Sequence, residues 1–318
     1  MHRPLIAITL ALAALTGSAQ DFPTRAINII VPNPPGGMNQ IHAQPLSAVL
    51  ENLYKQPAPV LNRPGGTAAV GTAFVANQPP DGYNILVTTP NLYLVIEKDK
   101  LYEIKSPYSL DQIALLALLS ADPLIMVVHP SLPVKNVKEL NALAKAKPNE
   151  LIFSSSGPYG ITHTPMAMYL DATGVKMRHL PTTGGGPAVV QALGGHAQLT
   201  GGGPAAVYPH VQSGKLRAIA SWGIKPYPAM PTVPTFKSMG YDIEAYLWVG
   251  LFTTAGVPAP VFNRMREIIG KVANDPAFKQ ALEKVHVVPD YRDTPEFKAF
   301  FDADYKRMAA AIKKIGKL

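Results

Sequence analysis

A short stretch near the N-terminus places the tightest constraint on the fold: residues 27–38 read INIIVPNPPGGM. Its first residues are apolar and mostly β-branched, which is typical of a buried parallel strand. Three prolines and two glycines end the strand, and an apolar pattern of helical period begins at Ile41. A strand, turn and helix start of this kind bring free backbone N–H groups together, and these attract a carboxylate or phosphate. Glycines also occupy such turns for purely steric reasons, so both interpretations stay open.

Short strands and helices alternate after this turn. The pattern predicts strands at 60–61 and 85–88 and a small-residue helix at 68–76. Such alternation predicts a parallel sheet flanked by helices. Ligands of parallel sheets bind at the carboxyl ends of the strands, where the first turn and the polar sequence TTPN at 88–91 both lie.

A second series of strands and helices begins near residue 123. Its strands are predicted at 124–128, 151–153, 177–180 and 216–220. A proline-rich stretch at 226–234 is expected to cross between two domains, and Trp248 in the following strand is expected to be buried. Two domains agree with the ordinary size of about 100–200 residues each.

The second series contains a short internal repeat. TGGGPAVV begins at Thr183, and TGGGPAAV begins at Thr200. A proline after a glycine run suits the first turn of a helix, so each copy offers another set of free N–H groups. The alternative is tight strand–helix packing that excludes side chains, and a glycine motif alone does not decide between the two.

Residues 1–19 have the layout of a secretory signal, with a positive start, an apolar run and small residues before the cut. The apolar run is too short to span a bilayer of about 30 Å, and a lipoprotein would need a cysteine at the cut. We therefore expect cleavage near Ala19 and export to the periplasm.

Composition excludes several classes of function. The chain has no cysteine, which excludes disulfides, thiolate metal sites and cysteine nucleophiles. The net charge of +8 comes from scattered lysines and arginines without the interleaved aromatics of a nucleic-acid surface, so no nucleic-acid partner is expected. The motifs GxSxG and HExxH and a Walker loop are missing from the sequence, which argues against an enzyme.

Eight segments together resemble the periplasmic substrate-binding proteins of tripartite tricarboxylate transporters, the Bug or TctC-like family, across the whole mature chain. They are VPNPPGG (31–37), LNRPGGTAAVGT (61–72), PPDGYNILV (79–87), HPSLPVKNVKEL (129–140), LPTTGGGPAVVQALGGHAQL (180–199), PHVQSGKLRAIA (209–220), PAMPTVPTFKSMGY (228–241) and VGLFTTAGVPAPV (249–261).

The resemblance implies an α/β fold of the two-lobed periplasmic binding protein type (type II-like), with a mostly parallel sheet flanked by helices in each lobe. Residues 20–122 and 226–318 are expected to form the first lobe and residues 123–225 the second. A ligand is clamped between the lobes, without a cofactor or metal. The expected partners are a small organic anion and the membrane permease subunits of a tripartite tricarboxylate transporter, and the protein is expected to act as a monomer.

In the family, the turns that match 34–39 and 182–186 hold a ligand carboxylate, largely through backbone N–H groups and bridging waters. Residues that match 156–163 line the same cleft from the second lobe. His163 is expected to donate to a ligand carboxylate or to serve only the packing of its helix, and Tyr159 to stack on the ligand or to form an exposed loop tip. The candidate ligand-binding residues are Asn33, Pro35, Gly36, Gly37, Met38, Asn39, Asn91, Ser155, Ser156, Tyr159, His163, Thr182, Thr183, Gly184, Gly185, Thr200 and Gly202.

The chain departs from the family pattern at several of these positions. Acids of the family are replaced by Gln40, Gln191 and Gln198, and an Asp-Asn pair is replaced by Gly202 and Gly203. An aromatic residue is replaced by Asn33, and a Tyr-Lys pair by Thr182 and Thr183. Pro45 falls inside the first helix of the family and is expected to delay its start or to bend it.

These departures predict a cleft with fewer negative charges and less bulk than in relatives. A buried protein carboxylate would favour an amine ligand, so its loss favours an anionic or neutral one. We expect a mono- or dicarboxylate, aromatic acids included, with the hydroxyls of Thr182, Thr183 or Thr200 near its far end. The alternatives are a periplasmic sensor partner of a membrane kinase and, less favoured, an enzyme that uses the same cleft.

Overall fold

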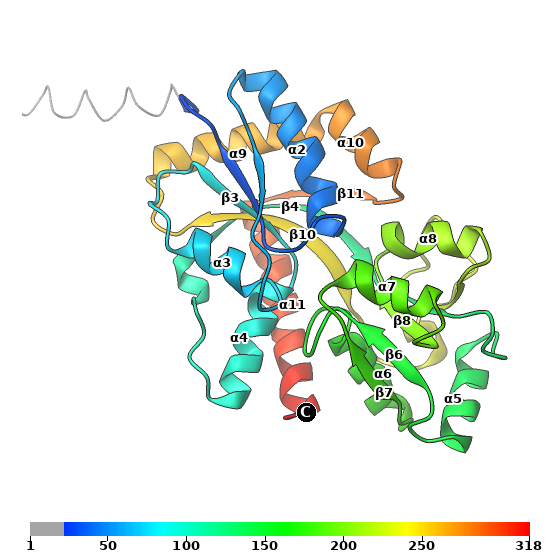
Figure 1. The fold of residues 1–318 in the computed structure, drawn as a ribbon. Coiled ribbons are helices and arrows are strands. Elements are labelled where there is room, and N and C mark those ends of the chain that lie inside the picture. The colour runs from blue at the N-terminus through cyan, green and yellow to red at the C-terminus, as the bar shows by residue number, and fades with distance from the viewer. Residues whose placement is uncertain (1–21) are drawn as a thin grey trace, which may run out of the picture.

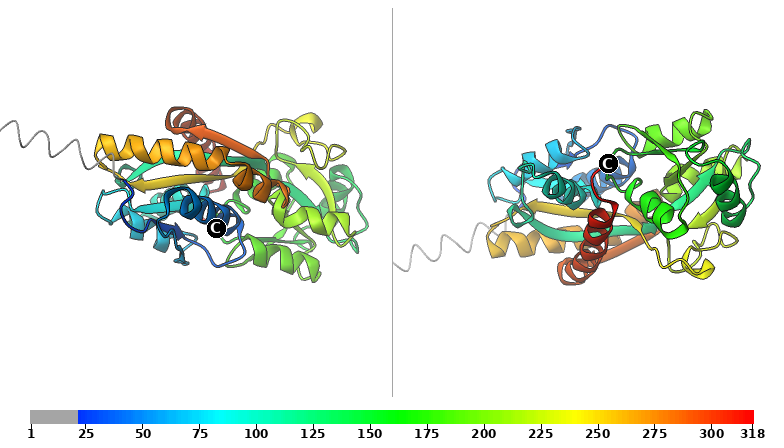
Figure 2. Two further views of the ribbon diagram at one scale, coloured as in Figure 1. Left: turned by 90° about the horizontal axis from the view of Figure 1, so that it is seen from above. Right: turned by 90° about the horizontal axis from the view of Figure 1, so that it is seen from below.

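The computed structural model describes residues 22–318, so the signal segment expected at 1–19 lies outside the described residues. Two β-sheets, each with its own helices, lie side by side (Figure 1). Views from above and below show the same two groups next to each other (Figure 2). Within residues 22–318, none of the helices combines the length and the apolar character needed to span a bilayer.

The first sheet has the strand order β11-β4-β10-β3-β1-β2. Its strands are β1 (Asn28–Val31), β2 (Val60–Asn62), β3 (Asn84–Thr88), β4 (Ile113–Pro123), β10 (Tyr246–Thr254) and β11 (Pro289–Asp293). The helices around it are α2 (Met38–Tyr54), α3 (Ala69–Ala76), α4 (Asn91–Tyr102), α9 (Ala259–Asn274), α10 (Pro276–Glu283) and α11 (Thr294–Ile315). A short 3₁₀ turn, η1 (Leu110–Gln112), precedes β4.

The second sheet has the strand order β7-β6-β8-β5-β9. Its strands are β5 (Ile125–Val128), β6 (Ile152–Ser155), β7 (Arg178–Pro181), β8 (Leu199–Gly202) and β9 (Arg217–Ser221). The helices around it are α5 (Val137–Ala146), α6 (Thr164–Thr173), α7 (Gly185–Leu193) and α8 (Pro204–Gln212). A second 3₁₀ turn, η2 (Lys237–Met239), lies between β9 and β10.

The α/β two-lobed fold is confirmed, but neither sheet is mostly parallel. In the first sheet β1 pairs in parallel with β2 and β3, whereas β10 pairs antiparallel with both β3 and β4. In the second sheet β5 pairs antiparallel with both β8 and β9. Strands β5 and β10 enter their sheets from the opposite lobe and run against their neighbours, and the late strand β11 also pairs antiparallel with β4.

The prediction that residues 226–234 cross between the lobes is wrong. Tyr227, Met230 and Val233 are buried in a cluster with side chains of β5 and α7, so this segment packs on the second sheet. The chain returns to the first sheet at Ala245, whose N–H donates to the carbonyl of Trp222 at 3.1 Å. The lobe limits stay a prediction, and this packing favours a limit near residue 245.

Helix α2 starts at Met38, directly after Gly37, and runs past Pro45. The alternative that Pro45 delays the start of this helix is therefore wrong. Close packing fixes the next helix: a Cβ on Gly71 of α3 would lie 2.7 Å from Cα of Pro32 and 2.8 Å from the carbonyl oxygen of Arg63. Both helices thus start next to the turn that follows β1.

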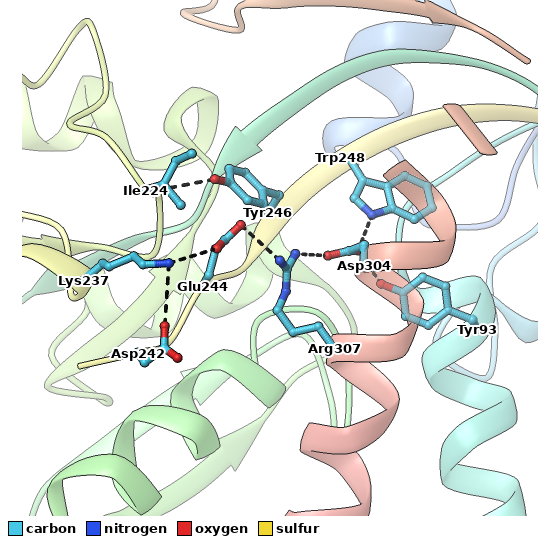
Figure 3. Close-up of polar contacts among 9 residues, drawn as sticks. All are labelled: Tyr93, Ile224, Lys237, Asp242, Glu244, Tyr246, Trp248, Asp304 and Arg307. Atoms are coloured by element: carbon cyan, nitrogen blue, oxygen red, sulfur yellow. Dashed lines mark hydrogen bonds and ion pairs between the residues drawn. The ribbon is translucent and has the colours of Figure 1, made fainter. Parts of the chain in front are cut away.

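A buried carboxylate anchors α11 to the first sheet. Asp304 is 2 % exposed and accepts hydrogen bonds from the hydroxyl of Tyr93 and from Nε1 of Trp248, both at 2.6 Å (Figure 3). Trp248 is fully buried, as expected from the sequence. Nη2 of Arg307 also donates to Asp304. One carboxylate therefore holds three donors from α4, β10 and α11.

The same arginine extends this network to the return crossing. Nη1 of Arg307 donates to Glu244 at 3.0 Å, and Lys237 lies between Glu244 and Asp242 at 4.0 and 3.6 Å (Figure 3). Glu244 directly precedes Ala245, where the chain re-enters the first sheet. The ion pairs therefore connect the core of the first lobe with the segment that joins the lobes.

Asp122 provides a pH-dependent contribution to stability beside the outbound crossing. It is 1 % exposed, its Oδ1 accepts the N–H of Val288 at 3.4 Å, and burial raises the pKa of its carboxyl from 3.8 to about 7. Between pH 4 and pH 7 the folded state thus holds a proton that the unfolded state has lost, so this group's contribution to stability falls as pH rises.

Asp122→Asn should remove that loss. We expect its melting temperature to match that of the wild type near pH 4 and to exceed it above pH 7. The corresponding gain in the free energy of unfolding is up to about 4 kcal/mol. Thermal melting of both proteins between pH 4 and pH 8.5 measures the difference. A difference that stays constant across this range would contradict the assignment.

Candidate ligand-binding site

A cavity of about 240 Å³ lies between the two sheets. The first lobe contributes the turn after β1, the start of α2, Thr67, the tip after β3 and Leu247 of β10. The second lobe contributes the loop after β6 and the glycine turns before α7 and α8. The cavity therefore lies where the carboxyl ends of strands from both sheets meet, as ligand sites of α/β sheets do.

The wall from the first lobe is built from the start of α2. Gly37 is the N-cap in an extended conformation, and its carbonyl accepts the first hydrogen bond of the helix, from the N–H of Ile41 at 3.1 Å. The N–H groups of the first turn, residues 38–40, precede that bond and have no partner inside the helix. Gly36 has φ +88°, a conformation that a side chain would strain. The turn thus presents backbone N–H groups beside the cavity.

The wall from the second lobe repeats this arrangement at the start of α7. Gly184 caps the helix, and its carbonyl accepts from the N–H of Ala188 at 3.1 Å. The N–H groups of Gly185 and Gly186 therefore lie before the first bond of the helix. A Cβ built on either of these glycines would meet no heavy atom within 4 Å. Close packing does not account for them, which favours the interpretation of an open anion-binding turn.

The glycines of the second copy of the repeat are closely packed, unlike those of the first copy. A Cβ on Gly202 would lie 2.6 Å from Cγ1 of Val207, and one on Gly203 would lie 2.6 Å from Cδ2 of Leu247. Gly202 permits close packing of β8 on α8, and Gly203 permits close packing of the turn before α8 on β10, while both residues line the cavity. The packing interpretation therefore accounts for the second copy, whereas the glycines of the first copy face open space.

The cavity wall carries no ionisable side chain among the described residues that form it. Its polar groups are the backbone of the glycine turns and the side chains of asparagine, threonine and serine. An anion bound here would be held by N–H donors and by the positive ends of the helix dipoles at α2 and α7 rather than by a lysine or arginine.

Twelve of the seventeen candidate residues line the cavity. They are Asn33, Pro35, Gly36, Gly37, Met38, Asn39, Asn91, Ser156, Thr183, Gly184, Gly185 and Gly202. The remaining five do not line it. They are Ser155, Tyr159, His163, Thr182 and Thr200.

His163 is 2 % exposed and faces the interior of the second lobe. Its Nδ1 accepts the N–H of Tyr159 at 3.1 Å, and its ring lies 4.3 Å from that of His179. Burial, together with the neighbouring His179, lowers the pKa of His163 to about 3, so the ring is neutral at physiological pH. Its position matches the packing alternative and not a donor to the ligand.

Tyr159 is neither a stacking platform nor an exposed loop tip. It is 3 % exposed, and its hydroxyl donates to the carbonyl of Gly316 at 2.9 Å and lies 2.9 Å from the hydroxyl of Tyr102. Since Tyr102 ends α4 and Gly316 follows α11, this side chain ties the loop after β6 to the first lobe. It thus acts at the contact between the lobes.

The hydroxyl groups of three candidate residues form hydrogen bonds with other groups of the protein and not with the cavity. Oγ of Ser155 lies 2.7 Å from Nε2 of His179, and Oγ1 of Thr200 donates to the carbonyl of Ser154 at 2.9 Å. Oγ1 of Thr182 lies 2.8 Å from the carbonyls of Ser155 and Gly184. Of the three threonines expected near the far end of the ligand, only Thr183 lines the cavity.

The three glutamines in place of family acids also lie off the wall. Oε1 of Gln40 accepts from Asn62 at 3.0 Å, and Oε1 of Gln198 accepts from the N–H of Ile152 at 2.8 Å. Gln191 lies on α7 away from the lining residues. These three side chains are therefore not part of the uncharged wall.

Twelve lining residues are not among the named candidates. Pro34, Ile161, Thr162 and Gly186 lie in segments expected to form the site, Thr89 lies in the polar tip after β3, and Gly203 is one of the departures from the family pattern. Sequence reasoning missed the other six, which are Ile41, Thr67, Pro187, Ala205, Ala206 and Leu247. The rule that ligands bind at strand ends could have found Thr67, which follows β2. No local signal marks Leu247, which lies at the start of β10, just after the chain re-enters the first sheet. In residues 22–318, no group of three or more acidic or histidine side chains could hold a metal ion.

Comparison with known families and proteins identifies relatives over most of the chain. A profile described as "Tripartite tricarboxylate transporter family receptor" matches residues 43–317. Protein BugT of Bordetella pertussis is 28% identical over 98% of this chain and 96% of its own length.

Solved structures share the fold. One described as a periplasmic transporter superposes with a TM-score of 0.84 at 28% identity and covers 92% of this chain and 98% of its own. An R. palustris protein solved with adipate has a TM-score of 0.83 at 22% identity, over 93% of this chain and 98% of its own. At 22% identity, the similarity to the protein solved with adipate shows a shared fold only.

Proposed function

Because the chain belongs to the tripartite tricarboxylate transporter receptor family, a family of solute-binding receptors and not of enzymes, we propose that it captures a small mono- or dicarboxylate in the cavity between its lobes. The loaded receptor then delivers the acid to the membrane permease subunits of a tripartite tricarboxylate-type system. It acts in the periplasm as a monomer. The relative solved with adipate, a dicarboxylate, supports this class of ligand.

One observation carries the proposal: two glycine turns, one from each lobe, present free backbone N–H groups to a cavity that has no ionisable wall residue. Each turn starts a helix of at least eight residues, whose N-terminus has a partial charge of about +0.5. A carboxylate offers only acceptors and a negative charge, so it matches these donors. An ammonium group would meet the same positive ends without a carboxylate to pair with.

Ligand contact with both walls would also favour closure of the lobes. A ligand shifts such an equilibrium only by the contacts that one state provides and the other lacks. In the structure the lobes already meet beside the cavity, where Oδ1 of Asn91 accepts the N–H of Ile161 at 2.9 Å. A carboxylic acid ligand that contacts the turn at Gly37 with one end and the turn at Gly185 with the other would add to this contact. It would thereby stabilise the closed receptor that docks on the permease.

Calorimetry with a panel of small carboxylates and amines of matched carbon skeletons tests this function. We expect at least one carboxylate to bind, and its matched amine to bind at least about 100-fold more weakly. Since no wall residue titrates, the preference should hold from pH 5.5 to pH 8. Tighter binding of an amine would contradict the proposal.

A further inference from the structure

A tyrosine of the second lobe makes several polar contacts with the first lobe. The hydroxyl of Tyr159 donates to the carbonyl of Gly316 at 2.9 Å and lies 2.9 Å from the hydroxyl of Tyr102. The N–H of Leu318 donates to the hydroxyls of Tyr159 and Tyr102, at 2.9 Å and 3.0 Å. The two tyrosine rings meet edge to face, with centroids 5.9 Å apart. We call Tyr102, Tyr159, Gly316 and Leu318 the tyrosine clasp.

The backbone of Tyr159 has a conformation that tyrosine rarely adopts. Its φ of +57° lies in the left-handed region, which is unfavourable for a residue with a bulky side chain. Two buried side chains maintain it: Nδ1 of His163 accepts the N–H of Tyr159, and Oγ1 of Thr164 donates to its carbonyl, both at 3.1 Å. Strained residues that the surrounding structure holds in place concentrate at functional elements. The strain therefore favours a role for Tyr159 beyond packing.

The clasp lies outside the ligand cavity and away from the chain crossings. Its four residues are not among those that line the cavity. The chain crosses between β4 and β5 and returns at Ala245, whereas Tyr102 ends α4 and Gly316 follows α11. A rotation of one lobe about the crossings changes the distances within the clasp, so a rotation that opens the cavity breaks its hydrogen bonds. The clasp thus stabilises the closed lobes by contacts within the protein alone.

Two further contacts join the same part of the second lobe, residues 156–173, to the first. The hydrogen bond between Asn91 and Ile161 belongs to the cavity wall. Nζ of Lys314 lies 2.6 Å from Oδ2 of Asp171, but these side chains are 72 % and 49 % exposed, so the ion pair contributes little. Tyr159 is buried, and a buried hydroxyl that loses its partners costs more. The clasp therefore combines a buried side chain with a position outside the cavity.

We propose that the tyrosine clasp holds the two lobes together before any ligand binds, so that the ligand-free receptor populates the closed form to a substantial fraction. The inference goes beyond the proposed function, since the clasp does not contact the cavity. The apparent affinity for a ligand that needs the closed form is proportional to the closed fraction. The clasp would therefore raise affinity without contacting the ligand.

The distance between the lobes in the dialysed, ligand-free receptor tests this inference. Because the chain has no cysteine, Asn52→Cys in α2 and Lys138→Cys in α5 place one spin label at an exposed position beside each sheet. Pulsed electron paramagnetic resonance then measures the closed and open populations. We expect Tyr159→Phe to lower the closed-to-open ratio of the doubly labelled receptor at least about tenfold. A receptor with native Tyr159 that is open throughout, or equal ratios with and without the substitution, would overturn the inference.

Two other tyrosine variants locate the effect. Tyr169→Phe is the matched control, because Tyr169 of α6 is buried and its hydroxyl donates to Oδ1 of Asn141 in α5 at 2.5 Å, beside the same sheet. It should lower the melting temperature and keep the closed-to-open ratio. Tyr102→Phe should lower the ratio less than Tyr159→Phe, which loses Gly316 as well. A ratio that falls as much in Tyr169→Phe as in Tyr159→Phe would contradict the assignment to the clasp.

Discussion

Replacing Gly37 by leucine should weaken carboxylate binding by at least about 100-fold and leave the fold intact. Gly37 has φ −92° and ψ 176°, which any residue adopts, and a Cβ there would meet no heavy atom within 4 Å. The leucine side chain would occupy the space beside the N–H groups of the first turn of α2. The cost to stability should be about 1 kcal/mol, since leucine caps a helix less well than glycine.

The same substitution at Gly71 is the contrast for stability, because it should lower the free energy of unfolding far more than Gly37→Leu. A Cβ there would lie 2.7 Å from Cα of Pro32, so the backbone would have to move and the melting temperature should fall by several degrees. Calorimetry and thermal melting of both variants separate the two effects. Wild-type affinity in Gly37→Leu would show that the turn after β1 does not contact the ligand.

The largest loss of stability is expected from Asp304→Leu. The buried carboxylate accepts from Tyr93, Trp248 and Arg307 at once, so its removal leaves the buried donors of Tyr93 and Trp248 without an acceptor, while Arg307 keeps Glu244. An unpartnered buried donor costs about 1–3 kcal/mol, so the two together cost about 2–6 kcal/mol. At about 2–4 °C per kcal/mol for a chain of this size, the melting temperature should fall by roughly 10 °C.

Asp302→Leu controls for the loss of an acidic residue two positions earlier in the same helix. Asp302 is exposed, and its one ion pair among residues 22–318 is with Lys298 at 2.6 Å, so the change should alter the free energy of unfolding by less than about 1 kcal/mol. Thermal melting of the two variants side by side measures the difference. Equal shifts would contradict the view that Asp304 organises the core of the first lobe.

Local patterns predicted most of the second sheet and the beginning of the first. The β-branched run at β1 and the amphipathic pattern of α5 carry their own signal, and the structure has both elements. Strand β4 was missed, because IALLALLSADP is rich in alanine and leucine and resembles a helix. It is extended because it pairs with β10 on one side and β11 on the other, partners more than 120 residues away.

The site was predictable where backbone geometry makes it. The turns around Gly37 and Gly185 were found because proline and glycine report backbone conformation directly in the sequence. The side chains of His163 and Thr200 were misplaced, since nothing local indicates that His179 or the carbonyl of Ser154 lies within reach. Side-chain direction depends on partners brought together by the fold, which a single sequence does not show.

A crystal structure of the protein with the tightest acid of the panel tests the central claim most directly. The account predicts carboxylate oxygens at about 2.7–3.2 Å from backbone nitrogens of residues 37–40, and the opposite end of the acid at the turn 184–186. A ligand held by a lysine or arginine, or bound away from both glycine turns, would contradict it.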